Sequence, residues 1–257
     1  MEWRERSGAR WLQAQLPGAT AAFSTRVGGV SEAPYDSLNL GILSDDDKSA
    51  VTENHGRLAA VLDLKPEHVA IGLQVHGTEL AIHAQAPLRC SLASYSEQKA
   101  QSKPVDMPAV DGHVIAEPGL AALVFVADCL PVALVGPGGV AMLHCGWRGL
   151  AAGIVARGVA AVGATHAAIG PGIGPCCFEV GDEVLDAFSG LGGGIASRRM
   201  LDLPEVARRL LAESGVGSVE SAGLCASCEP ELFFSHRRDR GRTGRQAGLA
   251  WLDAEAA

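Results

Sequence analysis

Short apolar runs bounded by glycine and proline recur along this sequence, and they constrain the fold more than any other feature. Runs of this kind are typical of buried strands. Such runs predict strands at residues 68–73, 119–127, 131–135, 140–143 and 166–169, and a last apolar strand in the C-terminal tail. Helical patterns alternate with them. The alternation predicts an α/β (α+β) layered fold, with mixed β-sheets flanked by helices.

The helical segments have recognisable ends. Helical patterns fall at residues 52–62, in an alanine-rich stretch that ends near residue 162, and at residues 180–188. Asp202 is the predicted N-cap of a helix over residues 206–213, with Pro204 in its first turn and Gly215 after its end. Residues 87–108 are polar and lack periodicity, which predicts an exposed loop. Neither a repeat nor a linker divides the sequence, so one domain over residues 1–257 is expected.

Composition excludes several classes of function. A formal net charge of −8 gives no general reason to expect nucleic-acid binding. No run approaches the roughly 18 apolar residues of a membrane helix, so no membrane partner is expected. The first residues, MEWRERSGARW, lack the apolar core of a secretory signal. The 7 cysteines are too few for a disulfide framework in a chain of 257 residues, and a cytoplasmic protein with free thiols is expected.

Three local sequences place a metal-binding side chain at a strand end, beside glycine or proline. They are LQVHG with His76, VADCLP with Cys129 and MLHCGWRG with His144. One thiolate and two imidazoles suit zinc, and three protein ligands leave a fourth position for water or substrate, as in catalytic sites. The separations match no standard zinc motif, however. On spacing alone, an ordinary interior side chain is the favoured interpretation of each residue.

Polar residues near these ligands are candidates for substrate binding and proton transfer. Arg26 and Arg148 lie in glycine-rich turns, and a guanidinium group binds phosphate through two parallel hydrogen bonds. Further arginines crowd the tail, where they could bind phosphate or form salt bridges within the fold. Asp128 precedes Cys129 and could exchange protons or cap the backbone. The glycine-rich GPGIGP lacks the Lys-Ser/Thr of a phosphate-binding P-loop.

The remaining cysteines have no clear role in the sequence. Cys225 and Cys228 form a CxxC, a moderately specific signal for metal binding or redox chemistry. No second CxxC or histidine pair accompanies it, so buried or incidental thiols are expected. The adjacent Cys176 and Cys177 are expected to pack rather than to form a disulfide. Cys145 follows His144 directly and should point to the opposite face of its strand.

The motifs together identify a family. FSTRVGGVS, SLNLG, LQVHG, VADCLPV, HCGWRGLAAGI, IGPGIGPCCFEVGDEV and FFSHRRDRGRTGRQA occur in the order seen in the YfiH-like, or laccase-domain, family, and the sequence resembles it from about residue 23 to 251. The resemblance implies a zinc-dependent purine nucleoside enzyme with metal ligands at His76, Cys129 and His144. Asn39 and Gln74 lie within its motifs and join Arg26 and Arg148 as expected substrate or phosphate ligands. His236 replaces a common tyrosine, and the loop at residues 89–105 looks longer than usual.

Several activities remain open at this stage. The resemblance implies phosphorolysis of adenosine, inosine or S-methyl-5′-thioadenosine by phosphate, and also deamination of adenosine. Copper-dependent polyphenol oxidation is an alternative cofactor and chemistry, although a multicopper site needs more histidines than the 8 present. Cys129 and His144 could instead be the nucleophile and base of a metal-free hydrolase. A zinc-stabilised binding module without catalysis is a further alternative, and the oligomeric state is not predicted.

Overall fold

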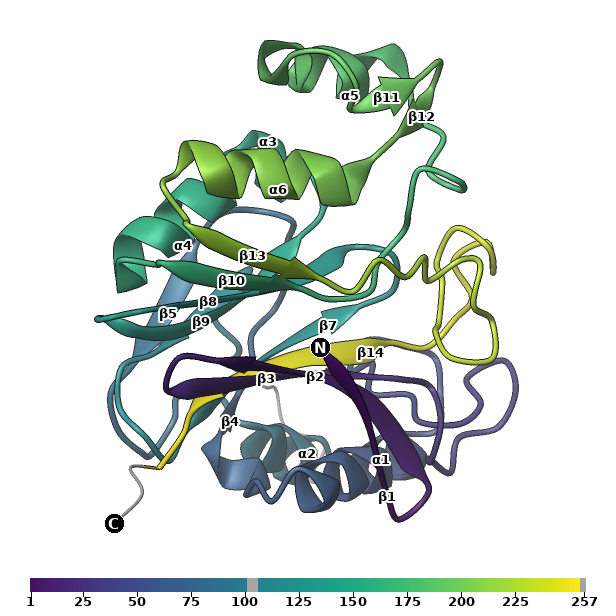
Figure 1. Ribbon diagram of the computed structural model, residues 1–257. Coiled ribbons are helices and arrows are strands. Elements are labelled where there is room, and N and C mark those ends of the chain that lie inside the picture. The colour runs from purple at the N-terminus through teal and green to yellow at the C-terminus, as the bar shows by residue number, and fades with distance from the viewer. Residues whose placement is uncertain (101–105, 255–257) are drawn as a thin grey trace.

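Two six-stranded β-sheets lie face to face in the computed structural model, and helices cover their outer faces (Figure 1). The structure describes residues 1–100 and 106–254. The first sheet has the order β1 (Glu2–Arg6), β2 (Ala9–Leu16), β3 (Ala19–Ser24), β14 (Gln246–Leu252), β7 (Ala121–Val126) and β4 (Val69–Ala70). The second has the order β13 (Ser218–Ser221), β10 (His166–Ile169), β8 (Leu130–Gly136), β9 (Gly139–Cys145), β6 (Gly112–Ile115) and β5 (Leu80–His83).

The helices form two outer layers. Helices α1 (Lys48–Val61) and α2 (Leu92–Ala100) lie below the first sheet, and α3 (Trp147–Ala151), α4 (Ile154–Val162) and α6 (Leu203–Glu213) lie above the second (Figure 1). The remaining elements are α5 (Asp182–Ala187), the 3₁₀ turns η1 (Pro66–His68) and η2 (Ser189–Leu191), and a hairpin of β11 (Ala196–Ser197) and β12 (Met200–Leu201). Among the described residues, no helix is long and apolar enough to cross a membrane.

Strand β7 shows why the apolar runs are continuous. Leu123 and Phe125 pack into the cluster beneath the first sheet, with α1 and α2. Val124 and Val126 pack into the cluster between the two sheets. Successive side chains of a strand point to opposite faces, so a strand covered on both faces must be apolar at every position. The same arrangement in β8 and β9 produces the runs that the sequence shows.

The predicted fold class is confirmed. Both sheets are mixed: β4 pairs in parallel with β7 and β10 with β13, while β8 and β9 pair antiparallel. The predicted cap is also present, since the Asp202 side chain accepts a hydrogen bond from the Glu205 backbone N–H at 3.0 Å. Cys145 is fully buried in the cluster that includes residues of α3 and α4. Met142, on the other face of β9, packs in the cluster between the two sheets. Cys145 therefore points away from the face that Met142 and His144 share, as its position predicts. The single-domain expectation stays a prediction.

The prediction of an exposed loop at residues 87–108 is wrong where the segment is described, and residues 101–105 lie outside the described residues. Helix α2 forms there because Leu92 and Tyr95, three positions apart, are buried against the first sheet's helical layer. The Ser94 backbone N–H donates to Ser91 Oγ at 3.1 Å, which caps the helix start. The serine cap is the one feature of the sequence that indicates this helix. Among the helix side chains that the structure describes, only Leu92 and Tyr95 belong to the buried cluster, and two apolar residues are too few to produce a helical periodicity.

Two element boundaries also differ from the prediction. The alanine-rich helix is broken into α3 and α4 at Gly153, whose φ of 93° lies in the left-handed region. The expected strand at residues 68–73 is reduced to β4, preceded by the turn η1. The chain then leaves the first sheet before it reaches His76, so that residue is held by a loop rather than by a strand end.

Candidate metal centre

The three predicted metal ligands come together at one end of the facing sheets. Cys129 lies between β7 and β8, His144 lies near the end of β9, and His76 lies in the loop after β4. One potential ligand atom from each residue lies within 4.8 Å of the others. The imidazole rings of His76 and His144 meet edge to face, with centroids 4.8 Å apart. His144 is buried, Cys129 is partly buried and His76 is exposed, so the cluster opens on one side.

Asp111 organises this cluster, and the sequence did not reveal it. Its fully buried carboxylate accepts hydrogen bonds from the backbone N–H groups of Val75, His76 and Gly77, at 3.1, 2.9 and 2.7 Å. It also lies 2.8 Å from Nδ1 of His144. That contact leaves Nε2 of His144 as the ring nitrogen that could bind a metal. Asp111 therefore orients two of the three candidate ligands. In the sequence, the only feature that could have indicated this role is its position directly before the buried strand β6.

Charge coupling between Cys129 and His144 favours the thiolate form of Cys129. Burial raises the pKa of the Cys129 thiol, but the charge and hydrogen bond of His144, with a hydrogen bond from His76, lower it to about 6. Burial lowers the pKa of His144, but the Cys129 thiolate and Asp111 raise it to about 9. Each group stabilises the charged form of the other. The thiolate is the form that binds metals and attacks electrophiles.

Gly146 provides the space that the ligands occupy. A Cβ atom at this position would lie 2.9 Å from Cys129 Sγ and 3.1 Å from His76 Cδ2. The backbone itself is ordinary there, with φ of −77°, so the requirement for glycine is steric. The motif HCGWRG thus contains a residue that matters for the site but was not singled out from the sequence.

Gly146→Ala is expected to weaken metal binding by about 10- to 100-fold, the range found when groups that position metal ligands are disturbed. The added methyl group must displace Cys129 or His76 from the geometry shared with His144. Competition with a chromophoric chelator measures the affinity. Gly56→Ala is the matched control, because a Cβ there meets nothing within 4 Å. Equal metal affinity of the two variants would show that the ligands tolerate the displacement.

A cavity of about 420 Å³ opens over the three ligands. A volume of this size suits a small organic ligand. Apolar side chains on its walls include Ile42, Leu43, Phe125, Ile173 and Phe178. Its polar groups, besides the metal ligands, include Gln74, Asp128, His236, Arg237 and Arg245.

Two of the predicted site residues line this cavity but also hold the backbone. Gln74 exchanges two hydrogen bonds with the backbone of Phe125, at 2.8 and 2.7 Å. The Asp128 carboxylate accepts from Ser235 Oγ and from the Arg237 backbone N–H, both at 2.7 Å. Asp128 thereby ties the C-terminal loop to the end of β7. A proton-transfer role for Asp128 stays a prediction.

The other predicted substrate ligands lie outside the cavity lining formed by the described residues. Arg26 is held against Asp36, through a contact of 3.0 Å, and stacks over Phe234. Arg148 is exposed and stacks over the Trp147 ring. Asn39 is fully buried and supports the cavity indirectly, since its Oδ1 accepts from the Arg245 backbone N–H at 2.9 Å.

The cationic groups at the cavity come instead from the arginine-rich tail. Arg245 contributes a guanidinium group to the cavity and also to a neighbouring one of about 350 Å³, which Arg240 and Arg242 line as well. Burial lowers the pKa of Arg245, while the negative charges at Cys129 and Asp128 oppose that change. Arg237 lines the first cavity and stacks over Phe178. These two arginines are the nearest candidates for binding an anion beside the metal ligands.

Comparison with known proteins agrees with this architecture. The multi-copper polyphenol oxidoreductase laccase family model matches residues 20–253. A purine nucleoside phosphorylase of Pseudomonas aeruginosa is 37% identical over 94% of this chain and 98% of its own. One from Deinococcus radiodurans is 40% identical over 95% of this chain and 94% of its own.

Solved structures show the same fold. The hypothetical protein YfiH of Bacillus licheniformis superposes with a TM-score of 0.85 at 31% identity, covering 98% of this chain and 99% of that one. The protein YlmD of Geobacillus stearothermophilus superposes with a TM-score of 0.84 at 33% identity, covering 98% and 99%. On both sequence and fold, this chain belongs to the YfiH-like, laccase-domain family.

Proposed function

We propose that this protein is a zinc-dependent purine nucleoside phosphorylase, which converts a purine nucleoside and phosphate to the free base and ribose 1-phosphate. The observation that carries the proposal is the His76–Cys129–His144 cluster at the base of a cavity that also contains Arg245. The names of the similar proteins support the reaction. Adenosine and inosine are the proposed substrates, together with S-methyl-5′-thioadenosine, whose sugar product is S-methyl-5-thioribose 1-phosphate.

The donor set fits zinc. A thiolate with two imidazoles is a ligand combination that zinc uses, and a carboxylate behind one histidine is the usual support for such a ligand. When bound, zinc supplies a Lewis acid that can polarise a substrate oxygen or a water molecule. Within residues 1–100 and 106–254, this is the only close group of three or more potential ligands that contains histidine. One mononuclear site is thus favoured over the several coppers of a laccase.

The cavity walls match the two substrates of phosphorolysis. Phe125 and Phe178 line the cavity and offer aromatic surface to a purine ring. Arg245 and Arg237 offer guanidinium groups to phosphate, which they can hold through parallel hydrogen bonds. Phosphate must be fixed next to the sugar carbon that it attacks while positive charge develops on the sugar. We propose that Arg237 and Arg245 of the arginine-rich tail hold the phosphate in that position.

Arg245→Gln is expected to raise the KM for phosphate about 10- to 100-fold, the effect of losing one hydrogen bond to a charged group. The KM for the nucleoside should change much less, and Arg245→Lys should recover part of the loss. Steady-state kinetics at varied phosphate give this separation. Arg57→Gln is the control, since Arg57 is exposed on α1 and pairs with Glu53. A parallel rise in both KM values would mean that Arg245 only supports the loop, through its bonds to Thr243 and Gly244.

The decisive experiment is incubation of the purified protein with adenosine, with and without phosphate. Phosphorolysis gives adenine and ribose 1-phosphate only when phosphate is present. Deamination, the additional activity that an open zinc position would permit, gives inosine in both cases. If adenosine, inosine and S-methyl-5′-thioadenosine all remain unchanged, the nucleoside assignment is wrong.

A metal-free Cys/His hydrolase is the second candidate, because the low pKa of Cys129 also suits a nucleophile. The two candidates differ in their response to metal removal. A chelator abolishes the activity of a zinc enzyme, and zinc restores it. A hydrolase survives the chelator and is inactivated when a substrate-like electrophile alkylates Cys129.

A further inference from the structure

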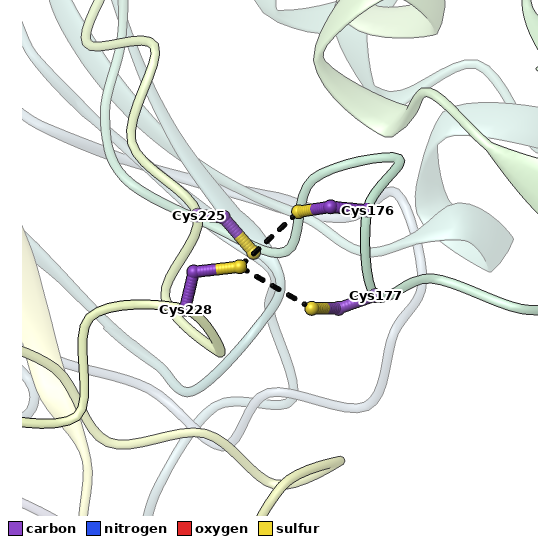
Figure 2. Close-up of side chains that lie close together, drawn as sticks. All are labelled: Cys176, Cys177, Cys225 and Cys228. Carbon is purple, nitrogen blue, oxygen red and sulfur yellow. Dashed lines mark hydrogen bonds between the residues drawn. The ribbon is translucent and has the colours of Figure 1, made fainter.

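The four cysteines that the proposed function does not use converge on one point. Cys176 and Cys177 come from the loop after β10, and Cys225 and Cys228 come from the loop after β13 (Figure 2). Their four sulfur atoms all lie within 4.8 Å of one another. Cys228 Sγ is 3.3 Å from Cys176 Sγ and 3.4 Å from Cys177 Sγ. Cys225 and Cys228 were expected to be buried or incidental thiols, but Cys228 is exposed and both lie beside the other pair.

Two tight turns aim the sulfurs inward. In the first, the backbone N–H groups of Cys177 and Phe178 both bond to the Gly174 carbonyl, which lets adjacent cysteines project toward the same point. In the second, the Cys228 N–H bonds to the Cys225 carbonyl at 3.1 Å. The Gly174 N–H also donates to Cys225 Sγ at 3.2 Å. Backbone N–H groups directed at a sulfur stabilise it as a thiolate.

We propose that Cys176, Cys177, Cys225 and Cys228 bind a second metal ion, a structural zinc held by four thiolates. Structural zinc sites are closed, with four protein ligands and tetrahedral geometry. A Zn–S bond of 2.3 Å places the sulfurs of a tetrahedral site about 3.8 Å apart. All four sulfurs lie within 4.8 Å of one another, which is close to that spacing. Glycine at position 174 leaves room for them, because a Cβ there would come within 3.3 Å of Cys225 Cβ and 3.5 Å of Cys176 Sγ.

The spacing favours one ion over an iron–sulfur cluster. In a cluster, the four cysteines are divided among two or more iron atoms, so sulfurs on different irons must stand farther apart than around a single ion, whereas all four sulfurs here lie within 4.8 Å of one another. A disulfide explains the arrangement less well, because Cys228 lies equally close to two partners and any single bridge leaves two thiols unused. Four thiolates this close repel one another strongly, and a divalent cation removes that repulsion.

The proposed ion joins two loops that form one side of the substrate cavity. Ile173 and Phe178 flank the first cysteine pair and line the cavity. The second loop continues to His236 and Arg237, which line it as well. The loops already meet in an isolated β-bridge between Gly172 and Cys225, and the Arg237 guanidinium donates to the Glu179 carbonyl at 2.8 Å. The ion holds this wall without contacting substrate, and its presence does not depend on which reaction the cavity supports.

Metal analysis of the purified holoprotein and its variants tests the proposal. Cys228→Ser and Cys176→Ser change exposed positions and are expected to lose one zinc per chain relative to the wild type. Cys90→Ala is the matched control, because it removes a thiol that belongs to neither cluster, and it should keep all the zinc. Cys129→Ala should keep the ion held by the four cysteines. X-ray absorption at the zinc edge of that variant should show sulfur ligands alone.

A second measurement covers the case in which the serine variants do not fold. In the wild-type holoprotein, the four cysteines should resist alkylation until a chelator removes the zinc, although Cys176 and Cys228 are exposed. Unchanged zinc content in the serine variants overturns the proposal. So does rapid alkylation of the four thiols in the holoprotein, or a native disulfide among them, found by mass spectrometry. Absence of zinc–sulfur coordination from the Cys129→Ala spectrum would overturn it as well.

Discussion

Cys129→Ala is expected to remove the metal from the cavity and to lower kcat/KM for phosphorolysis at least about 100-fold, since a bound metal contributes several kcal/mol to transition-state stabilisation. The thiolate is the only anionic ligand in the cluster of His76, Cys129 and His144. Its loss leaves two imidazoles, one of them buried and paired with Asp111. Metal content and steady-state kinetics measured on one preparation test both effects together.

Suitable controls separate the metal from the fold. Cys90→Ala should retain both the activity and the full metal content, because Cys90 is buried beneath the first sheet and away from the cavity. Circular dichroism should show Cys129→Ala folded, as the side chain lies at the edge of the core. Loss of activity with full retention of metal would favour the nucleophilic thiolate. Full activity without Cys129 would contradict both roles.

Asp111→Ala is expected to weaken metal binding about 10- to 100-fold and to lower the free energy of unfolding by about 3–5 kcal/mol. Two consequences follow from one missing carboxylate. Three backbone N–H groups around His76 lose their acceptor, and the Nδ1 position of His144 loses the group that orients it. Denaturant unfolding of the metal-free protein measures the stability, and chelator competition measures the affinity.

Asp182→Ala provides the comparison for a carboxylate at the surface. Asp182 also forms a salt bridge, at 2.8 Å with Arg199, but both side chains are exposed. Its removal should cost less than about 1 kcal/mol, because water screens such a pair. Asp111→Asn should fall between Asp111→Ala and the wild type, since its carbonyl oxygen can still accept hydrogen bonds. Equal stability of Asp111→Ala and Asp182→Ala would show that Asp111 does not organise the site.

Local chemistry explains where sequence reasoning succeeded and where it did not. The runs at β7, β8 and β9 are apolar because both faces of each strand are covered, and a run of that kind is visible without a structure. The Asp202 cap involves residues only three positions apart. Helix α2 was not predicted because only one face of this short helix is buried. That face packs in a cluster with residues of α1 and the first sheet, which are far away in the sequence.

The candidate site divides in the same way. The motifs around His76, Cys129 and His144 were recognisable, and the structure brings the three residues together. Asp111 lies more than 30 positions from either histidine, so the sequence could not show that its carboxylate contacts both the His76 backbone N–H and Nδ1 of His144. Nor could it show which arginines reach the cavity, because Arg26 and Arg148 are held elsewhere by Asp36 and Trp147.

The sequence alone therefore indicated the buried strands β7, β8 and β9 and the capped helix α6, because burial on both faces and capping depend on single residues and their near neighbours. It pointed to His76, Cys129 and His144 as candidate ligands only through the order of the family's motifs. Tertiary structure decided which distant residues meet. Cys176 and Cys228 are 52 positions apart, yet their sulfurs are 3.3 Å apart. That proximity depends on the parallel pairing of β10 with β13. Because the strands are parallel, the two cysteine loops begin next to each other, at the same end of the second sheet.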